Sequence, residues 1–234
     1  MDWDLIVRGY DQTLRRSGFV RVCDQGTDSG PLELYNRTLN AAKGELEMQR
    51  VLGSHPHLVA PDDLGLGCCW VKPHPWFARE FELDFMVARL NSGGLSWYII
   101  ELQRPDTHLF NIGNPDRGTG RRRGEPSGQL REGIDQIERW RGWLRRTGRD
   151  SLSSSYPNLD TTAVGVVVIG RAHKRTLDDN ERISELVLSR PNLMIRSYDW
   201  LARAERVRLG RGEAVQGPGW SRCGFDHDNG RFIL

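Results

Sequence analysis

The sequence has no long apolar run. No part of its 234 residues approaches the roughly 20 consecutive apolar positions that a membrane-spanning helix requires. The first four residues, MDWD, are acidic and lack the basic and apolar regions of a secretory signal. We therefore expect a soluble, cytoplasmic protein that does not associate with a membrane.

Cysteine is scarce, and its spacing argues against a zinc site. The four cysteines are Cys23, Cys68, Cys69 and Cys223, and no two of them form a CxxC pair. Adjacent residues of a strand point to opposite faces, so Cys68 and Cys69 do not converge. Zinc needs convergent ligands at characteristic spacings. Ordinary buried thiols are the simpler interpretation.

Nucleotide-binding motifs and a strong net charge are also missing. The chain has neither a Walker loop nor a GxGxxG motif, which argues against nucleotide-driven chemistry. The net charge is only +2. Arginine is nevertheless clustered in 117–123 and 139–149, and guanidinium groups suit phosphate recognition. A solvated surface explains these clusters equally well.

What the sequence does contain is a regular series of apolar patterns. Helical spacing predicts helices over 3–16, 38–54, 127–146, 178–188 and 199–207. Apolar, β-branched and aromatic runs predict strands over 66–71, 81–90, 95–102, 162–169 and 193–197. Residues 18–35 look irregular or carry short strands, and 104–127 look like a long loop. The order of these elements predicts an α/β fold with a mixed β-sheet flanked by helices.

A tight-turn signal, Asn91-Ser92-Gly93-Gly94, separates two of the predicted strands. In a symmetric hairpin with Ser92 and Gly93 at its tip, the numbers of paired residues add up to 185. Asp84 then faces Glu101, with Cβ atoms about 4.5–5.5 Å apart. Two carboxylates this close repel each other, and a divalent cation such as Mg²⁺ would remove the repulsion.

The same register extends the polar face of the hairpin. Gln103 follows Glu101 by two residues and projects to its face, and Glu82 would lie opposite Gln103. The intervening apolar residues, which are Leu83, Phe85, Ile100 and Leu102, would point into a core. The pattern is also compatible with one solvated face of a half-buried sheet.

The spacing Asp–x16–Glu–x–Gln resembles the pattern of the PD-(D/E)XK nuclease superfamily. In that pattern an Asp and a Glu hold the metal, and a Lys two residues after the Glu helps to position the attacking water. Here Gln103 stands in place of the Lys, and Leu83 stands where the pattern has a Pro before Asp84.

A narrower resemblance is to the nuclease domain of the Shedu anti-phage defence family. Five segments resemble that domain in the same order, namely 44–52 followed by His55-Pro56, 97–105, 133–141, 167–171 and 195–201. The resemblance spans about 38–206. It implies an N-terminal helical or irregular extension over 1–37, a PD-(D/E)XK nuclease-like domain with a restriction-endonuclease-like core over 38–208, and a C-terminal tail over 209–234.

The resemblance implies a metal-dependent DNA endonuclease in bacterial anti-phage defence, with Mg²⁺ or alternatively Mn²⁺ as cofactor. By similarity, Asp84 and Glu101 would bind the metal. Glu45 would add a further acidic group, with Glu47 as the competing choice. Two glutamines, Gln103 and Gln136, would orient water or phosphate.

Gln103 is the main departure from the superfamily pattern, because a neutral amide cannot offset negative charge in a transition state. Lys72, Arg79 and Arg104 are the candidates for supplying that charge. We expect Arg104, Arg121, Arg122 and Arg123 to contact DNA through its phosphates. The expected partners are DNA and further copies of the chain. The alternative function is a catalytically inactive nucleic-acid-binding or sensing module with the same fold.

Overall fold

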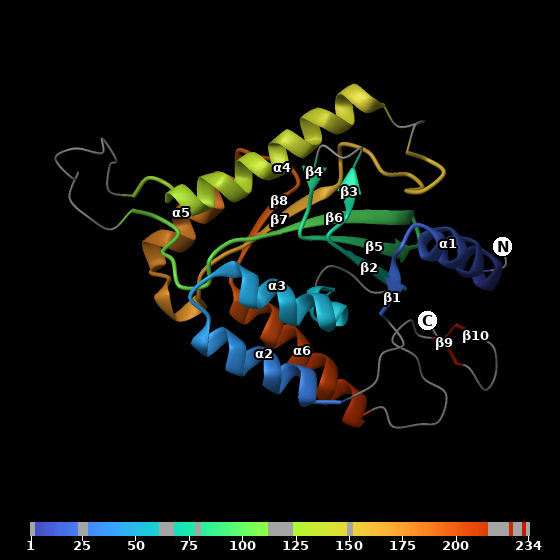
Figure 1. Cartoon of the computed structure of the whole chain (residues 1–234), viewed down its shortest axis with the longest axis horizontal. Coiled ribbons are helices and arrows are strands. Elements are labelled where there is room, and N and C mark those ends of the chain that lie inside the picture. The colour runs from blue at the N-terminus through green and yellow to red at the C-terminus, as the bar shows by residue number, and fades with distance from the viewer. Residues whose placement is uncertain are drawn as a thin grey trace.

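The computed structural model describes residues 3–22, 28–60, 68–77, 81–111, 124–148, 152–214, 225–226 and 231–232, the side chains of 211–214 and of the last two pairs excepted. These residues form an α/β structure in which helices cover both faces of a six-stranded sheet (Figure 1). The expectation of a mixed sheet flanked by helices, with a helix at the N-terminus, is confirmed.

The sheet combines an antiparallel half and a parallel half. Its strands lie in the order β1 (Val20–Arg21), β2 (Cys69–Pro73), β5 (Phe85–Asn91), β6 (Gly94–Leu102), β7 (Val164–Val168) and β8 (Leu193–Arg196). The first four strands pair antiparallel, whereas β6, β7 and β8 pair parallel. Parallel neighbours need a crossover connection, which α4 and α5 provide.

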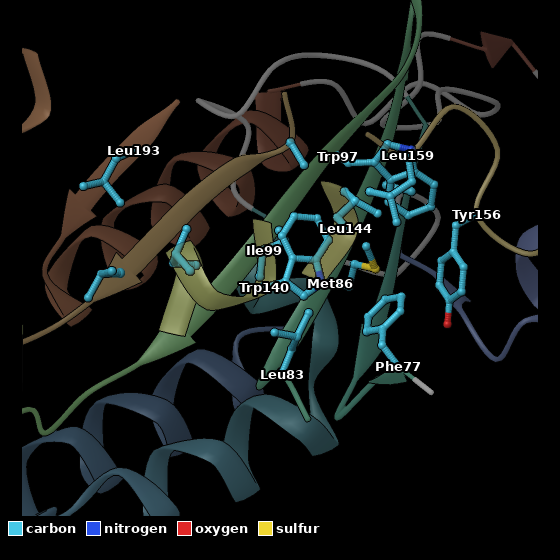
Figure 2. Close-up of a cluster of buried hydrophobic side chains, with 14 of the residues drawn as sticks. Phe77, Leu83, Met86, Trp97, Ile99, Trp140, Leu144, Tyr156, Leu159 and Leu193 are labelled. Atoms are coloured by element: carbon cyan, nitrogen blue, oxygen red, sulfur yellow. The ribbon is translucent and has the colours of Figure 1, made fainter. Parts of the chain in front are cut away.

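One face of the sheet is covered by α1 (Trp3–Arg16), α4 (Gly128–Thr147) and α5 (Leu177–Leu188). The predicted stripe of α4 is buried, from Ile134 and Ile137 to Trp140 and Leu144. Figure 2 shows Trp140 and Leu144 among the sheet residues Met86 and Ile99. The helix begins where expected, because the Ser127 hydroxyl accepts a hydrogen bond from the Leu130 amide at 3.2 Å.

The other face packs against α2 (Gly30–Ala41), α3 (Glu45–Ser54), the 3₁₀ turn η1 (Pro56–Val59) and α6 (Tyr198–Ala214). Met48 and Leu52 of α3 are fully buried there, as is Tyr198 at the start of α6. Each face therefore has its own apolar cluster, and the sheet lies between them (Figure 1). A second 3₁₀ turn, η3 (Ala172–Lys174), follows β7.

Two local predictions were wrong, and a third was correct only in part. The helix predicted over 38–54 is two helices, because the backbone is extended at Ala42 and at Gly44, the N-cap of α3. The segment 18–35 contains the short strand β1, as expected, but it also contains the start of α2, which was not expected. The strand predicted over 81–90 is divided into β4 (Phe81–Glu82) and β5, and β4 pairs with β3 (Trp76–Phe77) in a separate small sheet.

The C-terminal part continues the helix α6 to Ala214. Two short strands, β9 (Phe225–Asp226) and β10 (Arg231–Phe232), pair beyond it. Within the part of the chain that the structure describes, no helix is long and apolar enough to span a membrane.

Candidate active site

The register predicted for the hairpin is confirmed. Every pair between β5 and β6 adds up to 185, from Asn91↔Gly94 at the turn to Phe85↔Ile100 at the other end. The Asn91 side chain accepts a hydrogen bond from the Gly93 amide at 2.9 Å and closes the turn. The next positions outward are Asp84 and Glu101. Their carboxyl groups share a hydrogen bond, so the hairpin brings the two together as expected.

Glu101 lies on the face that α4 covers, because it continues the series of Trp97 and Ile99, whereas Asp84 just before β5 is held by Gln49 of α3. Glu101 is only 3% exposed, so the face is not the solvated surface that the sequence left open as an alternative. Burial raises the pKa of Glu101 well above its ordinary value, and the Asp84 charge raises that pKa further. Burial also raises the pKa of Asp84, although hydrogen bonds from the Leu102 amide, at 2.6 Å, and from the Gln49 side chain partly oppose this.

Glu82 does not belong to this face. The main strand ends at Phe85, and Glu82 pairs with Trp76 in the small sheet, so the predicted pairing with Gln103 was wrong. Leu83 enters the apolar cluster under α4, whereas Phe85 packs on the opposite face. The Glu82 carboxylate is exposed and lies 3.8 Å from the His74 ring.

Helix α3 contributes two side chains from its first turn and a half. Glu45 is half-buried, and burial together with the Asp84 charge raises its pKa. Glu47 is exposed. Of the two competing glutamates, Glu45 is therefore the one whose charge reaches Asp84. Gln49 lies four residues after Glu45, and its amide donates to the Asp84 carboxylate.

Gln103 and Gln136 meet between the sheet and α4. The Gln103 amide donates to the Gln136 side-chain oxygen at 3.0 Å. The backbone of Gln103 is held as well, because its N–H donates to Val168 at 2.8 Å and its carbonyl accepts from the Tyr198 hydroxyl at 2.7 Å. The sequence placed both glutamines in the site, and the fold brings them into contact.

Gly133 allows α4 to approach this pair closely. A Cβ atom at position 133 would lie 2.8 Å from Val167 Cγ1 and 3.1 Å from Gln103 Cγ. We expect Gly133→Ala to destabilise the protein, because an overlap in a packed core costs about 1–3 kcal/mol. This cost exceeds the gain of up to about 1 kcal/mol from replacing a helical glycine with alanine.

Urea unfolding measures the effect of Gly133→Ala, and Gly142→Ala on the same helix is the control. A Cβ atom at position 142 would meet only the ends of the Arg145 and Arg146 side chains, at 3.5 Å or more. Gly142→Ala is therefore expected to be neutral or stabilising. If Gly133→Ala also stabilised the protein, close packing at Gly133 would not be what limits the approach of α4.

A pocket of about 580 Å³ opens between α3, the end of β6 and α4. Its walls include Glu45, Gln103, Arg104, Glu132 and Gln136, whereas Asp84 and Glu101 lie outside its lining. The pocket is therefore lined by the half-buried Glu45 and the exposed Arg104 together with the buried Gln103, and neither carboxyl group of the Asp84–Glu101 pair is part of its wall.

The cations expected near the site have different positions. Arg104 is exposed at the pocket, forms a 2.9 Å ion pair with Asp106 and lowers the pKa of Glu45. Lys72 is held elsewhere, because its ammonium donates to the Ser17 carbonyl at 2.7 Å and to the Tyr156 hydroxyl. Lys72 therefore does not replace the missing lysine. Arg79, Arg121, Arg122 and Arg123 lie outside the described residues.

Within the described residues, no group of three or more His, Cys, Asp or Glu side chains is arranged to hold a metal ion. This finding does not decide against magnesium. Mg²⁺ keeps several of its waters and is commonly bound through one or two carboxylates together with substrate phosphates. Asp84 and Glu101 match that donor set in chemistry and number.

The profile of the family described as "Shedu protein SduA, C-terminal" matches residues 42–202, which is more than half of the chain. The chain belongs to the Shedu SduA C-terminal family. The match runs from just before α3 into α6, so this Shedu protein carries Glu45, Asp84, Glu101, Gln103 and Gln136 within the family region. No curated protein matches the chain.

The sequence analysis did not identify two residues of the site, Gln49 and Arg139. Gln49 lies within the segment 44–52 that resembles the family, and Arg139, whose charge lowers the pKa of Glu101, lies within the arginine cluster 139–149. Helical spacing could have found both. Gln49 is four residues after Glu45, and Arg139 is three residues after Gln136, so each shares a helix face with a predicted site residue.

Proposed function

We propose that this Shedu protein is a metal-dependent DNA nuclease that acts in anti-phage defence. Membership in the Shedu family supports the defence role. The observation that carries the proposed chemistry is the pair of the half-buried Asp84 and the buried Glu101, two acidic side chains that share a hydrogen bond next to the paired ends of β5 and β6.

The electrostatics of the pair favour a cation ligand. The groups that donate hydrogen bonds to Asp84 are neutral, namely the Gln49 side chain and the Leu102 amide. Among the described residues, no lysine or arginine side chain donates a hydrogen bond to Asp84 or Glu101. A buried and a half-buried carboxylate in contact, without a directly bonded cation, are costly when both are ionised. A divalent ion would compensate both charges together.

The neighbouring side chains fit the handling of a phosphodiester. A bound Mg²⁺ ion supplies Lewis-acid activation of the phosphate and a low-pKa water. Glu45, with its raised pKa, is placed at the pocket to accept a proton from water. Gln103 and Gln136 orient oxygen atoms through their amides. Arg104 offers a cation to the DNA phosphates at the mouth.

A plasmid-cleavage assay with Mg²⁺ or Mn²⁺ tests the proposal. We expect nicking by the wild-type protein that a chelator abolishes. Asp84→Asn is expected to reduce the rate at least about 100-fold, because it removes half of the cation's charged donors. Glu82→Gln is the matched control, since this exposed carboxylate is only two residues away but outside the site. Its rate is expected to equal that of the wild type.

Two outcomes would contradict the nuclease proposal. Cleavage that survives Asp84→Asn would show that the acidic pair is not the active centre. DNA binding without nicking in either metal would favour the inactive binding or sensing module. The hydrogen bond between Gln103 and Gln136 is the observation on the side of that second function, because it places an amide pair where the superfamily pattern has a lysine. Homo-oligomerisation stays a prediction.

A further inference from the structure

A basic edge lies next to the acidic site, at the carboxyl ends of β7 and β8. It consists of Arg171, Lys174 and Arg175, which follow β7, and Arg196, which ends β8. The edge is joined to the site through the segment after β6. The Gly170 amide donates to the Arg104 carbonyl at 3.2 Å, and the Lys174 ammonium donates to the Asp106 carbonyl at 2.8 Å. A DNA strand that leaves the pocket past Arg104 would therefore reach this basic edge next.

Arg175 has an unusual environment within this edge. Its side chain is half-buried, and its Nε and Nη2 atoms are shielded from solvent without a hydrogen-bond partner in the described part of the chain. Burial lowers the pKa of Arg175, and the neighbouring charge of Arg196 lowers it further. Shielded donors without an acceptor cost free energy, more so when they belong to a charged group.

The carboxylates near Arg175 are engaged with other groups. Asp179 accepts the Thr176 amide at 2.8 Å in the capping box that begins α5. Asp199 forms a 3.1 Å ion pair with Arg171 and also accepts the Ala172 amide. Both acids raise the pKa of Arg175 through their charge, but neither provides it with a hydrogen bond in the described residues.

Arg196 is oriented beside Arg175 by its own contacts. Its guanidinium carbon lies 5.7 Å from the centre of the Trp200 ring, and its Nη1 donates to the Ile195 carbonyl at 3.3 Å. A cation–π contact of this kind holds a guanidinium near the ring without using its N–H donors. The fold therefore places the positive charges of Arg175 and Arg196 near each other. Arg175 has two N–H groups that donate no hydrogen bond within the described residues.

We propose that Arg175 and Arg196 bind a phosphate of the DNA strand that enters the carboxylate site. A phosphate diester carries one negative charge and several acceptor oxygens, so it would relieve the repulsion between the two guanidinium groups of this half-buried pair. The proposal rests on the proposed function for the identity of the ligand. It assigns this edge to holding the DNA backbone beside the reacting bond, not to the reaction itself.

The test replaces Arg175 with methionine, which keeps an unbranched apolar side chain but removes the charge. Binding of a fluorescent DNA duplex is measured without metal over a range of salt concentrations. We expect Arg175→Met to weaken binding about tenfold, the equivalent of one charge-assisted hydrogen bond. The slope of log affinity against log salt should fall in magnitude by about one, as for the loss of one phosphate contact.

A second readout separates a binding role from a structural one. If Arg175 stays without a partner until DNA binds, Arg175→Met should raise the thermal midpoint of the free protein by about 2–4 °C. A side chain that stabilised the fold would give the opposite shift. Arg190→Met is the matched control. It also removes one positive charge, but Arg190 precedes β8 and therefore lies at the end of that strand opposite to Arg196.

The proposal is overturned if Arg175→Met and Arg190→Met reduce DNA affinity equally, since only overall charge would then matter. It is also overturned if Arg175→Met binds like the wild type, or if it lowers the thermal midpoint. These results are independent of catalysis. A wild-type protein that binds DNA without cutting it contradicts the proposed nuclease, and the comparison of the two arginine variants still decides the phosphate site.

Discussion

Replacement of Glu101 by glutamine is expected to lower DNA cleavage at least about 1000-fold. Glu101 is the more deeply buried of the two paired carboxyl groups, and the amide cannot carry the charge that a divalent ion needs. Loss of one preorganised electrostatic contact commonly costs about 100- to 1000-fold in rate, and here the metal's position is lost as well. Cleavage of supercoiled plasmid under saturating Mg²⁺ measures the effect.

The same variant should be more stable than the wild type, and increasingly so as the pH rises. Burial and Asp84 raise the pKa of Glu101 in the folded protein, so the folded state binds the proton more tightly than the unfolded state does. At pH values below the unfolded pKa, Glu101 is protonated in both states and costs nothing. As the pH rises toward the raised folded pKa, the wild type loses stability that Glu101→Gln retains.

Thermal unfolding between pH 4 and pH 8, without metal, tests that trend. Glu185→Gln on the exposed side of α5 is the control, and its midpoint should follow that of the wild type. Mg²⁺ should raise the wild-type midpoint at neutral pH, because an ion that binds only the folded state stabilises it. A Glu101→Gln protein that is less stable at pH 8 than the wild type would contradict the assignment of Glu101 as a metal ligand held under electrostatic strain.

Trp140→Ala is expected to have the largest effect on stability, about 3–5 kcal/mol in the free energy of unfolding. Trp140 is fully buried at the centre of the cluster between α4 and the sheet (Figure 2). Its ring lies 6.3 Å, between centroids, from that of Phe77 in an edge-on arrangement. The alanine would leave a cavity that the surrounding strands cannot close. Urea denaturation with a matched wild-type control measures the loss.

Trp140→Phe separates packing from hydrogen bonding. The indole Nε1 of Trp140 has no hydrogen-bond partner in the described residues, so the phenylalanine keeps a buried ring and loses no polar contact. It should cost clearly less than the alanine. Trp140 is also one turn after Gln136, so Trp140→Ala should weaken cleavage through displacement of α4. Equal losses of stability for the two variants would show that ring volume is not what holds α4 to the sheet.

Local patterns were sufficient to predict much of the site. The turn at Asn91–Gly94 allows one symmetric pairing, and that pairing alone placed Asp84 beside Glu101. The apolar stripe of α4 predicted which face of that helix would be buried, and Ser127 predicted its start. These features depend on residues that are close in sequence, where the periods of helix and strand determine which side chains share a face.

Other parts of the site depended on long-range packing. Nothing local indicated that Leu83 would turn into the cluster under α4, which is why Glu82 was wrongly placed on the polar face. The contact of Gln49 with Asp84 also joins segments far apart in the chain. Such contacts depend on how whole elements dock, and hydrophobic periodicity does not specify that.

The sequence by itself determined the α/β class, the hairpin register and the pair of Asp84 and Glu101, because each follows from side-chain period and turn chemistry. Only the tertiary structure decided that Glu101 is buried and Asp84 half-buried. The packing of α4 over the sheet removes water from Glu101 and thereby raises its pKa. The tertiary structure also decided that Arg175 and Arg196 lie near each other, because the ends of parallel strands become neighbours only when the sheet has formed.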